Sequence, residues 1–220
     1  MTDALWRDWE ALWASARKAV LQLGAECEPA QVAPPAELRE VERVEADLGR
    51  PLPQSLRAVV LGFSRKVSFR WQLPDDTERP EEFAEIFAGE VGWNLGELVE
   101  LERSRKGWIE ACFPDAQNEY DAIWHGKLAF FSIANGDMLA IDEVIDGSPV
   151  IYLSHDDGDG HGQALGANFA DFVTRYSRLG CPGAEDWQWL PFHTCQHGSL
   201  LDPDSASAQR WQSWFGLPSV

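Results

Sequence analysis

Two histidines and three aspartates stand within seven residues, as His155-Asp156-Asp157-Gly158-Asp159-Gly160-His161. Loops rich in Asp and Gly can bind calcium or magnesium, although the EF-hand spacing is not met because no Glu occupies the twelfth position after Asp156. A His-Asp pair can also hold a transition metal for hydrolysis. One hypothesis is therefore a metal-dependent hydrolase built on His155, Asp156, Asp159 and His161, and the favoured alternative is a solvated strand-to-helix loop.

A second group of metal-ligand types is His193-Thr194-Cys195-Gln196-His197, with Cys181 nearby. Paired zinc knuckles use other spacings, and a His and a Cys two residues apart would chelate one ion only with strain. Whether Cys181, His193, Cys195 and His197 bind a metal stays open, and we expect no cofactor. The sequence also shows no Gly-x-Ser-x-Gly, no activated cysteine and no glycine-rich phosphate loop, so no catalytic residue is predicted.

Carboxylates dominate the remaining chemistry. Four of them follow or end neighbouring predicted strands: Asp137, Asp142, Asp156 and Asp157. Paired carboxylates at such positions can act as acid and base. The favoured interpretation is that they add to an acidic surface. The chain has 36 Asp and Glu against 18 Lys and Arg, a formal net charge of −18. This field repels nucleic acid and anionic membranes and favours a basic protein partner.

Composition also predicts a compartment. The four cysteines show no disulfide spacing, no basic stretch leads into an apolar segment near the N-terminus, and no window approaches the length of a membrane span. We therefore expect a cytoplasmic protein with reduced thiols.

The segment 127–156 is the predicted centre of the fold. Apolar runs at 128–134 and 138–141 flank Asn135-Gly136, and both of these residues tolerate the positive φ of a type I′ hairpin turn. A second turn at Asp146-Gly147 leads to a third strand at 150–153. The pattern predicts an antiparallel meander of three strands.

Helical and strand periodicities surround this centre. A Trp-rich amphipathic helix is predicted at 4–23, and strict alternation at 66–73 predicts a strand with one wet face. Residues 74–90 resemble an exposed acidic loop with a short helix near 83–87, and a strand is predicted around Trp187 and Trp189. The remaining predicted helices are 36–48, 54–63, 94–113 with Asn94 as N-cap, one from Asn168 to about Leu179, and one opened by Asp202-Pro203.

The order of these segments resembles the SUKH superfamily of Smi/Knr-like domains. The resemblance rests on the helix 38–48 ending in Gly49, Leu52-Pro53, Phe69-x-Trp71, the stretch 131–142, the strand 150–156 ending in His-Asp, Asn168-Phe169-Ala170-Asp171-Phe172, and Leu179-Gly180-Cys181. It implies an α+β fold, a twisted, mainly antiparallel sheet with helices packed on it. The predicted division is an N-terminal helix and connector at 1–36, a SUKH-like domain at 37–183, and a C-terminal extension at 184–220 that packs on the same domain.

The resemblance also implies a binding role, because bacterial members act widely as immunity proteins against secreted toxins, and the family has no agreed catalytic residues. The sequence hypothesis is a non-catalytic immunity protein that neutralises a basic toxin, for example a nuclease. A regulatory scaffold of the fungal Smi/Knr type and the metal-dependent hydrolase are the alternatives, and the oligomeric state stays open. The predicted contact residues are Asp137, Asp142, Asp156, Asp157, Asp159, Asp75, Asp76, Glu81 and Glu82.

Overall fold

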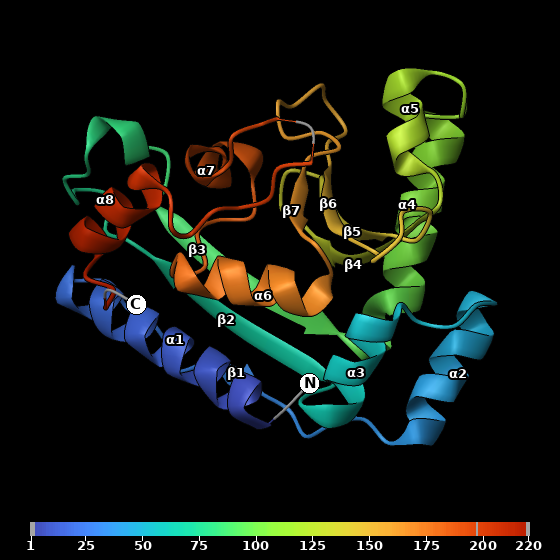
Figure 1. Ribbon diagram of the computed structural model, residues 1–220, viewed down its shortest axis with the longest axis horizontal. Coiled ribbons are helices and arrows are strands. Elements are labelled where there is room, and N and C mark those ends of the chain that lie inside the picture. Colours follow the sequence, from blue (N-terminus) through green and yellow to red (C-terminus); the bar gives the residue numbers. More distant parts are fainter. Residues whose placement is uncertain (1–2, 197, 219–220) are drawn as a thin grey trace.

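A computed structural model describes residues 3–196 and 198–218 (Figure 1). The chain folds into two antiparallel sheets with helices packed on them, so the predicted α+β class is confirmed, with the sheet divided in two. The helices are α1 (Asp3–Gln22), α2 (Leu38–Leu48), α3 (Gln54–Gly62), α4 (Leu98–Ala111), α5 (Glu119–Trp124), α6 (Phe169–Arg178), α7 (Asp186–Trp189) and α8 (Ala206–Phe215), with 3₁₀ turns at Glu81–Phe83, Leu95–Glu97 and Leu190–Phe192.

The first sheet has the strand order β1 (Gln31–Val32), β2 (Lys66–Gln72) and β3 (Ala88–Asn94). The second has the order β4 (Lys127–Ser132), β5 (Met138–Asp142), β6 (Val150–Leu153) and β7 (Ala164–Gly166). Figure 1 shows α1 along the first sheet, α4 beside β4 with α5 next to α4, and α6 in front of the first sheet with contacts to β3 and β7. No described helix has the length and apolarity that a membrane crossing requires.

The predicted meander is confirmed as β4, β5 and β6, but its first turn is of another type. Gly136 alone takes a positive φ of 106°, while Gly136 N–H donates to Ile133 O at 3.0 Å and Ile133 N–H donates to Asp137 O at 2.9 Å. Ala134 and Asn135 therefore occupy the centre of a four-residue turn. The predicted two-residue type I′ turn is wrong, because the Asn135 side chain instead accepts a hydrogen bond from Asp137 N–H.

Strand β3 was not predicted, since Gly89 and Gly92 interrupt its apolar pattern. Both glycines are required by close packing. A Cβ on Gly89 would come within 2.1 Å of Cys181 O and of the Trp71 ring, and one on Gly92 within 2.9 Å of Val67 O. Residues that look like loop formers thus allow a strand to lie under a large indole.

Two other local predictions are wrong. Residues 187–189 belong to helix α7 and not to a strand; there Trp189 is buried and Trp187 is 41% exposed. The last helix begins after Ser205, whose Oγ accepts from Ala208 N–H at 3.1 Å, whereas Asp202 accepts from Asp204 N–H in the preceding turn. The short β7 and α5 were also not predicted.

One apolar cluster joins the two ends of the chain to the middle. The predicted Trp stripe of α1 is confirmed as core, because Trp6, Trp9 and Trp13 are buried against Phe63 and Trp93. Trp211 and Phe215 of α8 are buried in the same cluster, with Phe215 beside Trp71. The N-terminal helix and the C-terminal extension therefore pack on the central region, although the boundaries at 36 and 183 stay predictions.

Candidate protein-binding surfaces

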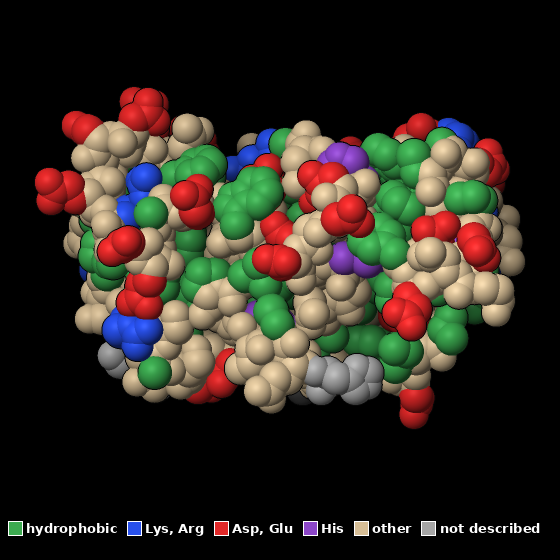
Figure 2. All heavy atoms as spheres, turned by 90° about the horizontal axis from the view of Figure 1, so that it is seen from above, with side chains coloured by type: hydrophobic (Ala, Val, Ile, Leu, Met, Phe, Trp, Pro, Cys, Tyr) green, Lys and Arg blue, Asp and Glu red, His purple; other side chains and the backbone are tan. Residues whose placement is uncertain are grey.

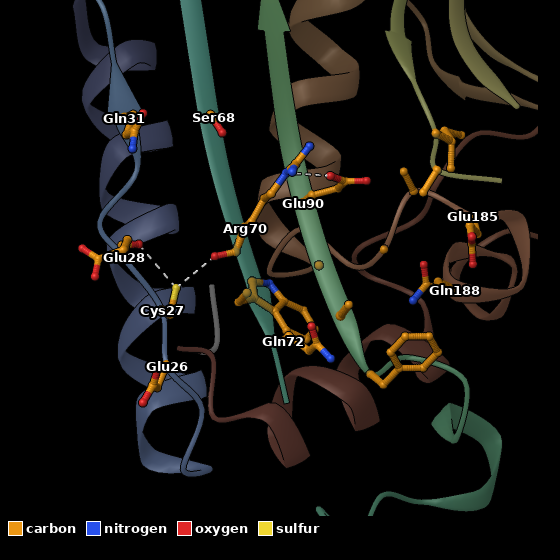
Figure 3. A pocket seen from close by; sticks show the side chains of 18 of the residues that line it. Glu26, Cys27, Glu28, Gln31, Ser68, Arg70, Gln72, Glu90, Glu185 and Gln188 are labelled. Atoms are coloured by element: carbon orange, nitrogen blue, oxygen red, sulfur yellow. Dashed lines mark hydrogen bonds and ion pairs between the residues drawn. The ribbon is translucent and has the colours of Figure 1, made fainter. Parts of the chain in front are cut away.

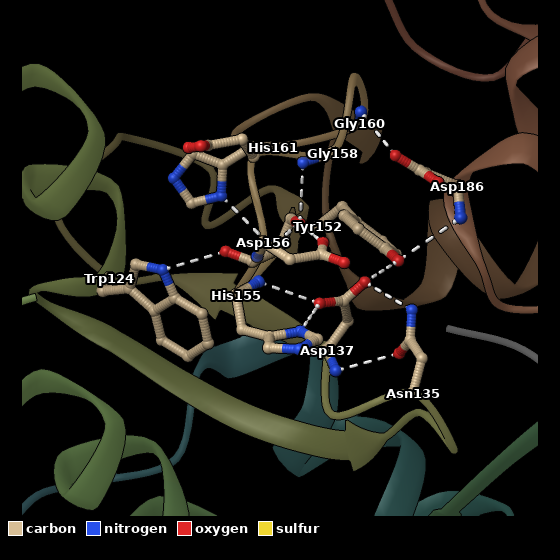
Figure 4. A network of polar contacts seen from close by, with 12 residues as sticks. Trp124, Asn135, Asp137, Tyr152, His155, Asp156, Gly158, Gly160, His161 and Asp186 are labelled. Carbon is tan, nitrogen blue, oxygen red and sulfur yellow. Dashed lines mark hydrogen bonds and ion pairs between the residues drawn. The ribbon is translucent and has the colours of Figure 1, made fainter. Parts of the chain in front are cut away.

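Asp137 is the centre of a polar network at the end of β6 (Figure 4). This residue is only 2% exposed, and its carboxylate accepts hydrogen bonds from His155 N–H at 2.8 Å, His155 Nδ1–H at 2.6 Å, Asn135 Nδ2–H at 2.8 Å and the Tyr152 hydroxyl. Burial, and then the hydrogen bond to Asp137, raise the pKa of Tyr152 far above its ordinary value, so this hydroxyl stays a donor. The network fastens the β4–β5 turn to the end of β6.

Asp142 is buried as well, at 4% exposed. It pairs with Lys127, whose Nζ lies 2.9 Å from Asp142 Oδ2 and which is itself 5% exposed. The other oxygen accepts from Val144 N–H and Ile145 N–H. The expectation that Asp137 and Asp142 belong to an accessible acidic surface is therefore wrong, because both carboxylates are consumed by internal donors.

The four residues of the alternative metal hypothesis do not form one ligand group among the described residues. His161 Nδ1 accepts from Ser154 N–H at 3.0 Å and Nε2–H donates to Tyr120 O at 3.1 Å, so neither ring nitrogen is free for an ion. Burial lowers the pKa of His161, which favours this neutral ring. Among the described residues, the ligand atoms of Asp137, His155 and Asp156 do lie within 4.8 Å of one another, but Asp137 already accepts its full set of hydrogen bonds.

The second candidate metal group is also dispersed, as far as it is described. Cys181 is fully buried in the core, and burial raises the pKa of its thiol far above the ordinary value. His193 Nδ1 accepts from Cys195 N–H and its Nε2–H donates to Ala164 O, so both nitrogens are engaged. His197 lies outside the described residues.

The other predicted contact residues do lie on the surface. They come from two segments: the β2–β3 connection, with Asp75, Asp76, Glu81 and Glu82, and the loop after β6, with Asp156, Asp157 and Asp159. Figure 2 shows acidic side chains distributed over this side of the molecule, with hydrophobic side chains between them.

Helix α7 connects the two acidic segments. Gly160 N–H of the loop after β6 donates to Asp186 Oδ2 at 2.9 Å, and Gln188 of α7 donates to Glu85 O at 3.4 Å. One acid is already neutralised, because Glu82 forms a two-bond ion pair with Arg210 of α8, with both contacts at 2.7 Å. Asp156 is also engaged, because it accepts a hydrogen bond from Ser154 Oγ–H at 2.9 Å.

A groove of about 590 Å³ lies next to this surface, on the face of β2 and β3 that turns away from the core (Figure 3). We call it the β2–β3 groove. Its floor is formed by outward residues of the two strands, and its walls by residues 26–31 on one side and by residues 133–134 and 183–188 on the other. The sheet face is therefore not covered by a helix here.

The charge of the β2–β3 groove is mainly negative. Glu26, Glu28, Glu90 and Glu185 line it, and Arg70 is the one cationic residue among the lining residues. Arg70 Nε lies 3.0 Å from Glu90 Oε2, directly across the β2–β3 register, and Figure 3 shows the arginine pointing toward that carboxylate.

The groove carboxylates are incompletely satisfied. Burial raises the pKa of Glu90, and the nearby Arg70 only partly opposes this shift. Burial also raises the pKa of Glu185, and the negative charges of Asp137, Asp186 and Glu90 act in the same direction. Perturbed pKa values cluster at functional sites, so these two carboxylates make the groove a candidate binding site.

The sequence contained part of this groove without identifying it. The strict alternation at 66–73 correctly predicted that Lys66, Ser68, Arg70 and Gln72 face away from the core. The walls could not be found in the same way, because Glu28, Glu90 and Glu185 come from separate parts of the chain and meet only after the sheet and α7 have formed.

The architecture is that of an α+β protein with an open, polar sheet face beside an acidic surface. A family model, the SMI1/KNR4 family (SUKH-1), matches residues 35–175, and the chain belongs to this family. The resemblance noted from the sequence is thereby confirmed. Comparison with curated proteins and with solved structures returned no match.

Proposed function

We propose that this protein is a non-catalytic binding module, an immunity protein that neutralises a basic toxin. Family membership supports a role as an immunity or regulatory module. The observation that favours a basic partner is the concentration of acidic side chains, both in the exposed loops and in the β2–β3 groove, where Arg70 is the one cation among the lining residues, on a chain of net charge −18.

Electrostatics would serve such a function in two ways. A large negative field increases the association rate with a positively charged partner, and complementary charges determine which partner is accepted. Toxins that cleave nucleic acid carry Lys and Arg to contact phosphates. An acidic protein that covers such a surface would exclude the nucleic acid.

The test first examines the genes beside this one for a secreted protein with a small basic C-terminal domain, and uses that domain as the candidate partner. Co-expression with this chain should restore growth, and the two proteins should co-purify, with an affinity that falls at least tenfold between ionic strengths of about 0.01 M and 0.1 M, where the Debye length shortens from about 30 Å to about 10 Å. Binding without growth rescue, or an affinity independent of salt, would contradict the proposal. A genomic neighbourhood without such a protein, together with capture of cell-wall synthesis proteins, would favour the regulatory scaffold.

A further inference from the structure

The β2–β3 groove has the shape of a channel for an extended chain. Its floor follows the strands, with the outward residues Ser68, Arg70 and Gln72 at steps of two. These positions span about 13 Å at the rise of a β-strand, which is the length of four or five extended residues. The residues of its two walls come from different segments, at 26–31 and at 183–188.

The chemistry of the groove also selects its occupant. Carboxylates stand on both walls and on the floor, so an occupant with several cationic side chains would meet a negative group on either side. Apolar contact is available as well, because the groove lining includes Phe87, which is 40% exposed, and Ala134, which is also exposed. A small anionic or neutral ligand would leave these carboxylates unpaired.

The position of Arg70 adds a specific detail. In the free protein its guanidinium binds Glu90, whose side chain is only 22% exposed, while Arg70 itself is 72% exposed. The arginine is therefore held on the open side of the groove by the very carboxylate that an incoming cation would reach. It neutralises Glu90 only in part, since the pKa of Glu90 remains raised.

We infer that the β2–β3 groove binds an extended, arginine- or lysine-containing segment of the protein partner, and that Arg70 is an internal competitor which the partner's cationic side chain displaces from Glu90. This inference rests on the proposed function and assigns the part of the partner that is recognised. The partner's guanidinium or ammonium group takes the place of Arg70 at Glu90, and its neighbours along the chain reach Glu28 or Glu185. The loop acids outside the groove contribute long-range attraction.

The experiment measures binding of a fluorescein-labelled peptide of about nine residues in which arginine and threonine alternate, as an extended chain requires. A peptide of the same composition with its arginines clustered at one end is the control for charge alone. The alternating peptide should bind more tightly. Equal binding of the two peptides would contradict the extended geometry.

Variants of the ion pair test the competition. Arg70→Gln should strengthen binding of the alternating peptide about tenfold, and Glu90→Gln should weaken it about tenfold, the size expected for a hydrogen-bonded charge pair. In Arg70→Gln/Glu90→Gln the first effect should vanish, because Arg70 competes only through Glu90. Circular dichroism and urea unfolding verify that each variant is folded.

The matched controls are Arg103→Gln and Glu100→Gln. These residues form an exposed ion pair on α4, outside the groove lining, so the variants make the same changes in net charge. Both should change peptide affinity less than about twofold. If Arg70→Gln behaves like Arg103→Gln, or Glu90→Gln like Glu100→Gln, the inference is wrong.

The same variants measured against the neighbouring toxin domain separate the two proposals. A toxin that is bound and neutralised equally well by Arg70→Gln, Glu90→Gln and the control variants would refute the groove inference and leave the immunity function standing. The expected peptide results, together with failure to bind or neutralise the toxin, would refute the immunity function and leave the groove specificity standing.

Discussion

The polar network around Asp137 and the β2–β3 groove both contain buried or half-buried carboxylates, but these carboxylates differ in their partners. Asp137 accepts four hydrogen bonds from neighbouring side-chain and backbone groups. Within the described part of the chain, Glu90 in the groove has one partner, Arg70, and burial keeps the pKa of Glu90 raised.

The number of internal donors indicates which carboxylates are available to a binding partner. A carboxylate that has exhausted its acceptor positions on internal donors stabilises the fold and has nothing left to offer another molecule. A carboxylate that is partly desolvated and has few internal donors still has acceptor positions that an external cation can fill. Counting aspartates in a sequence cannot make this distinction, because the donors come from distant segments.

The largest expected effect is on the Asp137 network. Asp137→Ala leaves the Tyr152 hydroxyl, the Asn135 amide and His155 without their acceptor, so we expect the free energy of unfolding to fall by about 4 kcal/mol. Urea unfolding followed by tryptophan fluorescence measures this loss. Asp159→Ala, at an exposed position of the loop after β6, should change stability by less than about 0.5 kcal/mol. Similar losses in the two variants would show that Asp137 is not the structural carboxylate described here.

The buried pair Lys127–Asp142 gives the next largest effect. Lys127→Met leaves the Asp142 charge buried without its cation, and we expect a loss of about 3 kcal/mol in unfolding free energy. The double variant Lys127→Met/Asp142→Asn removes both charges and keeps an acceptor for Val144 N–H, so it should regain most of that loss. A double variant as unstable as the sum of the single variants would contradict an interaction between the two residues.

Local patterns were sufficient for the elements whose residues face one environment. The α1 Trp stripe, the meander β4–β6, the alternation of β2 and the Asn168 cap of α6 all follow from spacing along the chain, and the structure has them at the predicted places. Strand β3 and helix α7 do not follow from spacing. Gly89 is required because a side chain there would collide with the Trp71 ring. In α7, Trp189 is buried whereas Trp187 is partly exposed, although both belong to one short helix.

Residue spacing along the chain predicts even less of the candidate site. The sequence identifies the exposed acids of both loops, but it also selects Asp137 and Asp142, whose burial depends on Tyr152, His155 and Lys127 folding around them. Conversely, Glu90 belongs to the segment 74–90 that the sequence predicts as an exposed loop, and only its antiparallel register with Arg70 places it on the floor of a groove. Long-range register, and not local composition, determines which acids can act.

The smallest expected effect is the change in the free energy of unfolding caused by ionisation of Glu90. Its pKa in the folded protein lies above the ordinary value, so its favourable contribution is fully present below that ordinary pKa and is lost as the pH rises through the folded value. Glu90→Gln cannot ionise and keeps this contribution. At pH 7 the variant should therefore equal or exceed the wild type in stability, by about 0.5 kcal/mol or less, and the difference should disappear as the pH is lowered through the folded pKa to below the ordinary value of 4.5. Urea midpoints along this pH series test the prediction, with Glu100→Gln as the control for the change in net charge.

A variant less stable than the wild type at neutral pH would mean that the Arg70–Glu90 pair is a net stabilising contact like Lys127–Asp142, and the contrast between the two regions would disappear. A more stable variant with weaker partner binding would show instead that the protein retains an unfavourable charge at this position for the sake of recognition.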